Sequence, residues 1–235
     1  MNIILLGYGK MGKEIEQIAL QRGHQVVLKI NRSNLQEATK ASLQKADVAI
    51  EFSTPHTVIE NIHKCFEAGL PVVVGSTGWY DQFEQIKKQC LQDKRSMFYA
   101  TNFSVGVNLF WKITEQMAKL MSGFPEYESS MQEIHHVHKL DKPSGTAITT
   151  AGKLLANQSQ KKTWSLENKY KDQLYIDVVR QDEVPGTHTV YYRSAVDEIS
   201  LTHLAYNRKG FALGAVLAAE FLAGKTGVYT MSDML

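Results

Sequence analysis

The sequence contains few cysteines, no large excess of either charge and no long apolar run. Its two cysteines, Cys65 and Cys90, both fall in segments that we expect to be helical. A disulfide framework needs more cysteines and an oxidising compartment, so we expect reduced, structural thiols. No apolar run approaches the length that crosses a bilayer, and residues 2–6 are too short for a signal peptide and lack a basic leader. We therefore expect a cytoplasmic protein without a membrane partner.

The charge balance argues against one class of partner. Lys and Arg number 26 against 24 Asp and Glu, a net charge of +2. Because no segment forms a basic stripe, we expect no nucleic-acid partner. The 235 residues are 43% hydrophobic and 21% charged, which is typical of a globular chain with one large core or two smaller ones.

The first hundred residues alternate between strand and helix patterns. Short apolar runs are separated by segments with helical spacing, as at Met11, Ile15 and Ile18. Apolar strands joined by helices indicate a parallel, doubly wound sheet covered on both faces, an α/β fold. The expected strands are 3–6, 25–30, 48–52, 71–75 and 97–100, and the expected helices are 11–22, 34–46, 55–68 and 79–92.

The pattern changes after Asn102. A long helix is expected over 105–121, and strands then follow one another with few helices between them. This order predicts a second α+β domain with a mainly antiparallel sheet and a helix or two on one face. Its expected strands are 127–136, 174–180, 189–192 and 198–204, with a helix at 146–157 and a loop at 158–172. A last apolar helix is expected at 210–223.

Gly7-Tyr8-Gly9-Lys10-Met11-Gly12 fits the pattern G-x-G-x-x-G. The first glycine permits a tight turn, the second lets backbone approach a pyrophosphate, and the third lets the helix pack on the strand. The motif directly follows an apolar strand and opens an amphipathic helix, which is the context that a Rossmann-type nucleotide site requires. The alternative is a tight turn without a ligand.

Three further segments lie at the same predicted sheet edge. Asn31 and Arg32 follow the second strand, where an acidic residue would normally bind the ribose. Asn can bond a hydroxyl and Arg can pair with a 2′-phosphate, so these residues favour a cofactor site that accepts or prefers NADPH over NADH. The alternative is that both are solvated residues of a surface loop. Ser53-Thr54-Pro55 and Gly75-Ser76-Thr77-Gly78 follow the third and fourth strands. They either line the nicotinamide or serve as helix caps and turns.

Residues 133–146 carry the densest chemistry, with His135, His136 and His138 within four residues. A zinc site is disfavoured because adjacent histidines on a strand point to opposite faces and no cysteine or second histidine cluster offers a third ligand. We expect no metal.

Proton chemistry fits the same segment better. His135 or Lys139 could deliver a proton as hydride arrives on a conjugated substrate. Ser144-Gly145-Thr146 opens a helix, where amides and hydroxyls bind an anion. The alternative is a solvated strand followed by a capped helix.

From Glu133 to Ala147 the sequence resembles the dihydrodipicolinate reductases, also called 4-hydroxy-tetrahydrodipicolinate reductases, of bacterial lysine and diaminopimelate synthesis. This segment matches the whole family pattern, which reads Glu, an aliphatic residue, His-His, two variable residues, Lys, one variable residue, Asp, one variable residue and Pro-Ser-Gly-Thr-Ala. The likeness continues at 75–78, 100–108, 185–188 and 224–235, and so spans essentially the whole chain.

The resemblance implies an NADPH- or NADH-dependent reduction of 4-hydroxy-tetrahydrodipicolinate by a homotetramer. It makes His135 a proton donor or acceptor and Lys139 the proton donor. Residues 1–102 with 208–235 would form the dinucleotide-binding domain, and 103–207 the substrate-binding and oligomerisation domain. The substrate residues would be His136, Ser144, Gly145 and Thr146. The nucleotide residues would be Gly7, Tyr8, Gly9, Lys10, Met11, Gly12, Gly75, Ser76, Thr77, Ala100, Thr101, Asn102 and Phe103, joined by Asn31 and Arg32 from the reasoning above.

Two departures from the family leave the choice of nucleotide open: the glycine loop is one residue shorter than usual, and Asn31 stands where the family often has an acid.

Three other functions compete with this reductase activity. A semialdehyde-type dehydrogenase needs a cysteine nucleophile, but neither cysteine is expected on a loop. A nucleotide-sensing module would not need Lys139, and a metal-dependent hydrolase would contain metal.

Overall fold

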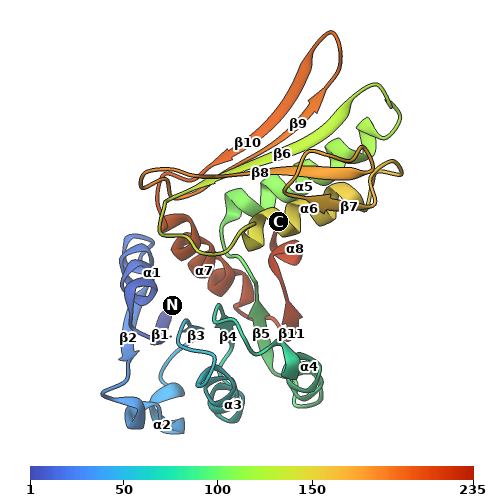
Figure 1. Cartoon of the computed structure of the whole chain (residues 1–235). Helices are drawn as coiled ribbons and strands as arrows, with labels where there is room; N and C mark the ends of the chain where they lie inside the picture. Colours follow the sequence, from blue (N-terminus) through green and yellow to red (C-terminus); the bar gives the residue numbers. More distant parts are fainter. The chain divides into compact units, whose positions relative to one another are not determined.

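The computed structural model describes residues 1–235, which form two compact units (Figure 1). Unit 1 consists of residues 1–105 and 209–235, and unit 2 of residues 106–208. The chain returns to unit 1 at the start of α7. In neither unit is any helix both long enough and apolar enough to cross a membrane.

Unit 1 is built on a six-stranded parallel sheet with the order β11-β5-β4-β3-β1-β2. Its strands are β1 (Asn2–Leu6), β2 (Gln25–Ile30), β3 (Val48–Glu51), β4 (Val72–Val74), β5 (Ser96–Tyr99) and β11 (Gly227–Tyr229). The chain passes from β1 to its neighbour on one side, β2, and then to its neighbour on the other side, β3. Ligands of such sheets bind at the carboxyl ends of the strands, at this point of reversal.

Helices cover both faces of the sheet, because its buried strands present apolar side chains to both sides. The helices are α1 (Lys10–Gln21), α2 (Lys40–Leu43), α3 (Val58–Ala68), α4 (Phe83–Gln92), α7 (Lys209–Leu222) and α8 (Met231–Met234). α1 and α7 pack with Ile3 and Leu5 in one core, and α2, α3 and α4 pack with Ile4 and Leu6 in another. The predicted Rossmann-type, doubly wound parallel sheet is confirmed.

Three predicted helices of unit 1 are shorter than expected. Segment 34–46 divides into the 3₁₀ turn η1 (Leu35–Glu37) and α2, because Thr39 and Ser42 form a capping box that starts a new helix. α3 begins at Val58 rather than at Pro55, since the amides of residues 57 and 58 bond the carbonyl oxygen of Thr54 in a turn. A second 3₁₀ turn, η2 (Tyr80–Gln82), precedes α4. The short elements β11 and α8 were not predicted.

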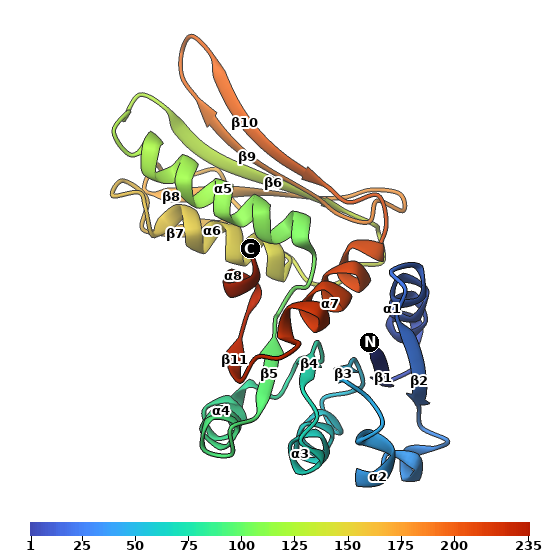
Figure 2. The same ribbon diagram turned by 180° about the vertical axis from the view of Figure 1, so that it is seen from behind.

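Unit 2 is a five-stranded sheet with two helices packed on one face (Figure 2). The strands are β6 (Glu128–His135), β7 (Thr163–Ser165), β8 (Gln173–Arg180), β9 (Thr187–Arg193) and β10 (Glu198–Leu204), and the helices are α5 (Val105–Met121) and α6 (Gly145–Leu155). Apolar residues of α5, α6, β6, β8 and β9 form its single core.

The second sheet is mixed, in the order β10-β9-β6-β8-β7. β6, β9 and β10 pair antiparallel as predicted, whereas β8 pairs parallel with β6 and β7 parallel with β8. The parallel pairing of β8 with β6 requires a crossover connection, and that connection contains α6. β7 falls in the segment 158–172, which was predicted to be a loop throughout.

Candidate active site

The glycine loop of unit 1 turns from β1 into α1 with no room for a side chain at two of its glycines. A Cβ at Gly7, whose φ is +105°, would lie 2.1 Å from the carbonyl oxygen of Phe52, and one at Gly12 would lie 2.4 Å from the carbonyl oxygen of Gly7. At Gly9 a Cβ would meet nothing within 4 Å. The backbone at Gly9 is therefore open to a ligand, as a pyrophosphate contact requires.

The loops after β3 and β4 meet beside this turn. The Ser53 amide donates to Ser76 Oγ at 2.8 Å and to Glu51 Oε1 at 3.1 Å. The ring of Phe52 occupies the space next to Gly75, where a Cβ would lie 2.1 Å from it. Burial raises the pKa of the Glu51 carboxyl. These hydrogen bonds hold both loops at the sheet edge where the glycine loop turns.

The other predicted nucleotide residues differ in exposure. Those with exposed side chains are Lys10, Thr77 and Thr101. Those packed in or against the core of unit 1 are Tyr8, Met11, Ala100 and Phe103. Asn102 Oδ1 accepts a hydrogen bond from the Ser104 amide at 2.9 Å. Of these, Ala100 and Phe103 are buried, so a nucleotide could contact them through their backbone groups.

The end of β2 presents a cation rather than a carboxylate. Asn31 Oδ1 accepts hydrogen bonds from the Ser33 amide at 2.8 Å and from Ser33 Oγ at 2.7 Å, so it closes the turn. Arg32 is exposed and makes no polar contact within the chain. Nearby Lys29 is engaged with Glu16 at 3.1 Å. Arg32 is therefore the charged group at this turn that remains available to a ligand.

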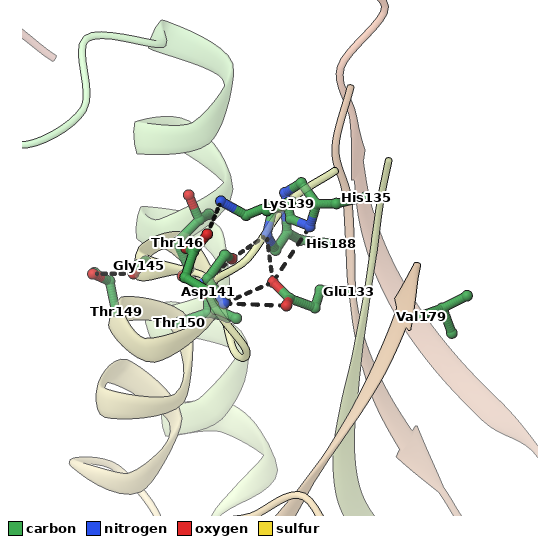
Figure 3. A network of polar contacts seen from close by, with 12 residues as sticks. Glu133, His135, Lys139, Asp141, Gly145, Thr146, Thr149, Thr150, Val179 and His188 are labelled. Carbon is green, nitrogen blue, oxygen red and sulfur yellow. Dashed lines mark hydrogen bonds and ion pairs between the residues drawn. The ribbon is translucent and has the colours of Figure 1, made fainter. Parts of the chain in front are cut away.

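In unit 2 the alternation of β6 places Glu133 and His135 on the buried face of the sheet. Glu133 lies at the centre of what we call the carboxylate cluster, and Figure 3 shows it beside His135 and His188. The cluster consists of Glu133, His135, Ser144, Arg180 and His188. The Ser144 amide donates to both oxygens of Glu133 at 3.1 Å, and Arg180 Nη2 lies 3.1 Å from Oε1. His135 Nδ1 and His188 Nε2 lie 3.5 Å and 3.6 Å from Oε2.

The amino end of α6 lies against this cluster. Ser144 caps the helix, since its Oγ accepts a hydrogen bond from the Ala147 amide at 3.2 Å. The amides of Gly145 and Thr146 have no partner within the chain. His136 lies just beyond β6 and is half-buried, with an unpaired Nδ1. Two free N–H groups at the positive end of the helix dipole can bind an anion.

Lys139 lies in the turn between β6 and α6. Its Nζ pairs with Asp141 Oδ1 at 2.8 Å, and its side chain is 23% exposed. Arg180 Nε donates to the carbonyl oxygen of Lys139 at 3.3 Å, and Arg180 Nη2 to that of Asp141 at 2.5 Å. The lysine bond keeps the pKa of the Asp141 carboxyl below its usual value. The turn is thus tied to β8, and the ammonium reaches solvent.

The carboxylate cluster holds its carboxyl charged and one imidazole neutral. Burial alone would raise the pKa of Glu133, but hydrogen bonds from His188, Ser144 and Arg180 outweigh it and lower that pKa to about 2. Burial, with the charge of His188 next, lowers the pKa of His135 to about 4. At neutral pH the His135 ring is therefore neutral, with one N–H group and one lone pair.

Sequence reasoning missed Arg180 and His188 and gave Glu133 no role. It also found no third metal ligand, which was wrong: one atom each from Glu133, His135 and His188 lie within 4.8 Å of one another. Both oxygens of Glu133 already accept a hydrogen bond, and Arg180 supplies positive charge there. The absence of metal stays a prediction that metal analysis of the purified protein tests.

Comparison with known proteins is consistent over the whole chain. The family description "Dihydrodipicolinate reductase, N-terminus" matches residues 1–103, and "Dihydrodipicolinate reductase, C-terminus" matches residues 106–235. The 4-hydroxy-tetrahydrodipicolinate reductase of Christiangramia forsetii is 46% identical over all of this chain and 98% of its own length. That of Archaeoglobus fulgidus is 33% identical over 97% of this chain and 96% of its own length.

A solved structure shares the fold. It is the dipicolinate-bound dihydrodipicolinate reductase of Paenisporosarcina sp. TG-14, with a TM-score of 0.82, 23% identity and full coverage of both chains. The two family matches together cover nearly every residue, in both units. This chain belongs to the dihydrodipicolinate reductase family.

Proposed function

We propose that the chain reduces 4-hydroxy-tetrahydrodipicolinate to tetrahydrodipicolinate with NADPH or NADH, with the 4-hydroxyl leaving as water, in lysine and diaminopimelate synthesis. Membership of the family makes it a pyridine-nucleotide-dependent oxidoreductase, and the relatives named above are called 4-hydroxy-tetrahydrodipicolinate reductases. One observation in the structure supports it most: unpaired amides at Gly145 and Thr146 stand beside the Lys139 turn and the buried His135.

The substrate is a cyclic dicarboxylate, and unit 2 offers groups suited to its charges. The amides of Gly145 and Thr146 would bind one carboxylate at the start of α6, helped by the helix dipole. His136 and the Lys139 ammonium are the other donors near this end. Ser144 acts indirectly, because its amide and hydroxyl are already bonded inside the carboxylate cluster. Two held carboxylates would orient the ring for attack.

Lys139 would give the proton that accompanies hydride transfer. Its side chain is 23% exposed, and Asp141 Oδ1 lies 2.8 Å from its Nζ. His135 is neutral at neutral pH, so it would accept a proton or a hydrogen bond. The loops of unit 1 would hold the nucleotide, which would supply the hydride: the glycine loop would bind the pyrophosphate, and residues 75–77 and 100–103 would line the nicotinamide.

The decisive experiment follows NADPH and NADH absorbance while a synthase supplies the hydroxy-tetrahydrodipicolinate. Oxidation of either nucleotide that depends on the synthase product is expected. No oxidation with either nucleotide would sink the proposal. A nucleotide-sensing module would bind NADPH under the same conditions without consuming it, which separates the two functions.

Thiol chemistry of the semialdehyde type has little support in the chain. Cys65 and Cys90 are buried in α3 and α4. Burial raises the pKa of both thiols, that of Cys90 to about 11, so neither supplies a thiolate nucleophile at neutral pH.

Gly9→Ala should weaken nucleotide binding without changing the fold. The backbone at Gly9 is extended and a Cβ there meets no protein atom, so the added methyl can clash only with a ligand. We expect the Kd for NADPH to rise by about 10-fold or more, which is at least ~1.4 kcal/mol, with Tm unchanged. Gly152→Ala, at a glycine of α6 with equally open surroundings, is the matched control. Equal Kd values for both variants would refute a pyrophosphate contact at Gly9.

Arg32→Ala should change the preference between nucleotides. A charge-assisted bond to a 2′-phosphate stabilises NADPH but not NADH. We expect KM for NADPH to rise by about 10-fold and KM for NADH to stay within about twofold. Lys45→Ala, which removes an exposed cation just before β3 at the opposite sheet edge, should change neither. Equal changes for both nucleotides would remove Arg32 from phosphate recognition.

We also propose a cytoplasmic homotetramer that assembles through unit 2. The sheet face turned away from α5 and α6 carries Ile134, Val179 and Tyr191, which neither helix covers. Sedimentation equilibrium should give four times the chain mass, and a monomer would refute the assembly.

A further inference from the structure

Glu133 is a buried charge to which the proposed reaction gives no role. Its side chain is fully inaccessible to solvent, a costly position for a carboxylate unless donors surround it. Strand register supplies them: Glu133 pairs across with His188 of β9, and His135 pairs across with Arg180 of β8. The sheet itself therefore brings two histidines and an arginine to one carboxylate.

Each neighbour of Glu133 must present a hydrogen to it, because an ionised carboxylate only accepts. Ser144 and Arg180 do so through their N–H groups at 3.1 Å. His135 Nδ1 is buried without a hydrogen-bond partner, and the carboxylate oxygen Oε2 of Glu133 lies 3.5 Å from it (Figure 3). A proton on Nδ1 meets a negative charge there, whereas a lone pair would be repelled.

The other ring nitrogen of His135 lies beside a glycine. A Cβ at Gly186 would lie 3.0 Å from His135 Nε2, and Gly186 adopts a φ of +155°. Any side chain at Gly186 would crowd Nε2. The two surroundings distinguish the two nitrogens: Nδ1 faces the carboxylate, and Nε2 faces backbone without a side chain.

We propose that Glu133 is a positioning residue that keeps the ring proton of His135 on Nδ1, so that Nε2 is the accepting nitrogen, while the same carboxylate anchors the start of α6 through the Ser144 amide. This inference rests on the proposed function, in which His135 and α6 serve the substrate. A carboxylate that sets the tautomer of a histidine is a recurring device in enzymes. Here one carboxylate also fixes an anion-binding helix end.

The first test is the tautomer in the wild-type enzyme. Nitrogen NMR of protein labelled with 15N-histidine distinguishes Nδ1–H from Nε2–H, and the spectrum of His135→Gln assigns the signal of His135. We expect Nδ1–H at pH 7. An Nε2–H ring overturns the proposal, whether or not the enzyme turns over the predicted substrate, so this result is separate from the proposed function.

The second test is Glu133→Gln, which keeps the size of the side chain and replaces one acceptor by a donor. We expect His135 to change to Nε2–H and kcat to fall by at least about 10-fold, as when a histidine is held in the wrong tautomer. The Kd for NADPH should stay constant, because the glycine loop belongs to unit 1. Normal kcat with an unchanged tautomer overturns the proposal.

Glu183→Gln is the matched control. It makes the same change at an exposed carboxylate of unit 2, which pairs with exposed His138 at 3.2 Å. We expect no change in kcat, in KM for the dicarboxylate or in the His135 signal. A fall in kcat equal to that of Glu133→Gln would show a general charge effect and overturn the positioning role. If Glu133→Gln does not fold, the wild-type spectrum still decides.

Discussion

Replacing Lys139 by alanine is expected to lower kcat by about 100- to 10,000-fold, the range that a positioned proton donor contributes. The Lys139 ammonium stands in a turn that Arg180 fixes through two carbonyl oxygens, and Asp141 holds its Nζ at 2.8 Å. Alanine removes the proton and leaves the backbone bonds of the turn intact. Initial rates at saturating NADPH and substrate measure the effect.

The affinity for NADPH should stay nearly constant in Lys139→Ala, because Lys139 belongs to unit 2 and the glycine loop to unit 1. Lys142→Ala is the matched control, since it removes an exposed cation three residues further on. It should change kcat by less than about threefold, as expected for a screened surface charge. If Lys139→Ala retains turnover close to that of Lys142→Ala, another group donates the proton.

The fold could be predicted from the sequence wherever apolar patterns were long. The runs at β1 and β3 and the helical spacing of α1 and α5 gave those elements almost to the residue. Elements of three or four residues in polar stretches are too short to show a hydrophobic periodicity that would predict them. β7 has three residues in a polar stretch, and only its pairing with β8 makes it a strand. The segment 34–46 kept a helical spacing through η1 and α2, but the cap at Thr39 outweighed it.

The candidate site was predictable where its residues are neighbours in sequence. His135, Lys139 and the start of α6 lie within one short segment, so residue types alone indicated proton chemistry beside an anion site. Arg180 and His188 join them through strand register. Register depends on how β6, β8 and β9 pair, which local patterns do not specify. For the same reason the sequence did not reveal that His188 joins Glu133 and His135 as a third potential metal ligand.

Acid should destabilise the fold through His135. Its pKa in the folded protein is about 4, because of burial first and the charge of His188 second, against 6.5 in the unfolded chain. Between these values the unfolded chain binds the extra proton, so stability is full above pH 6.5 and is lost progressively as pH falls towards 4. The pKa of Glu133 falls from 4.5 to about 2, so its contribution is lost only at lower pH. At about 1.4 kcal/mol per pH unit, the lowered pKa of His135 reduces the free energy of unfolding by roughly 2.5 kcal/mol between pH 7 and pH 4.5.

His135→Gln isolates this effect, because it removes the titrating ring and leaves the other histidines in place. Burial also lowers the pKa of His203, so its protonation also lowers the folding stability as the pH falls, but equally in both proteins. Urea unfolding at pH 7 and at pH 4.5 should therefore show the wild type losing roughly 2.5 kcal/mol more than the variant. Equal losses would mean that His135 titrates normally when folded, and a normally titrating ring would be partly protonated near neutral pH. His135 would then share the role of proton donor with Lys139.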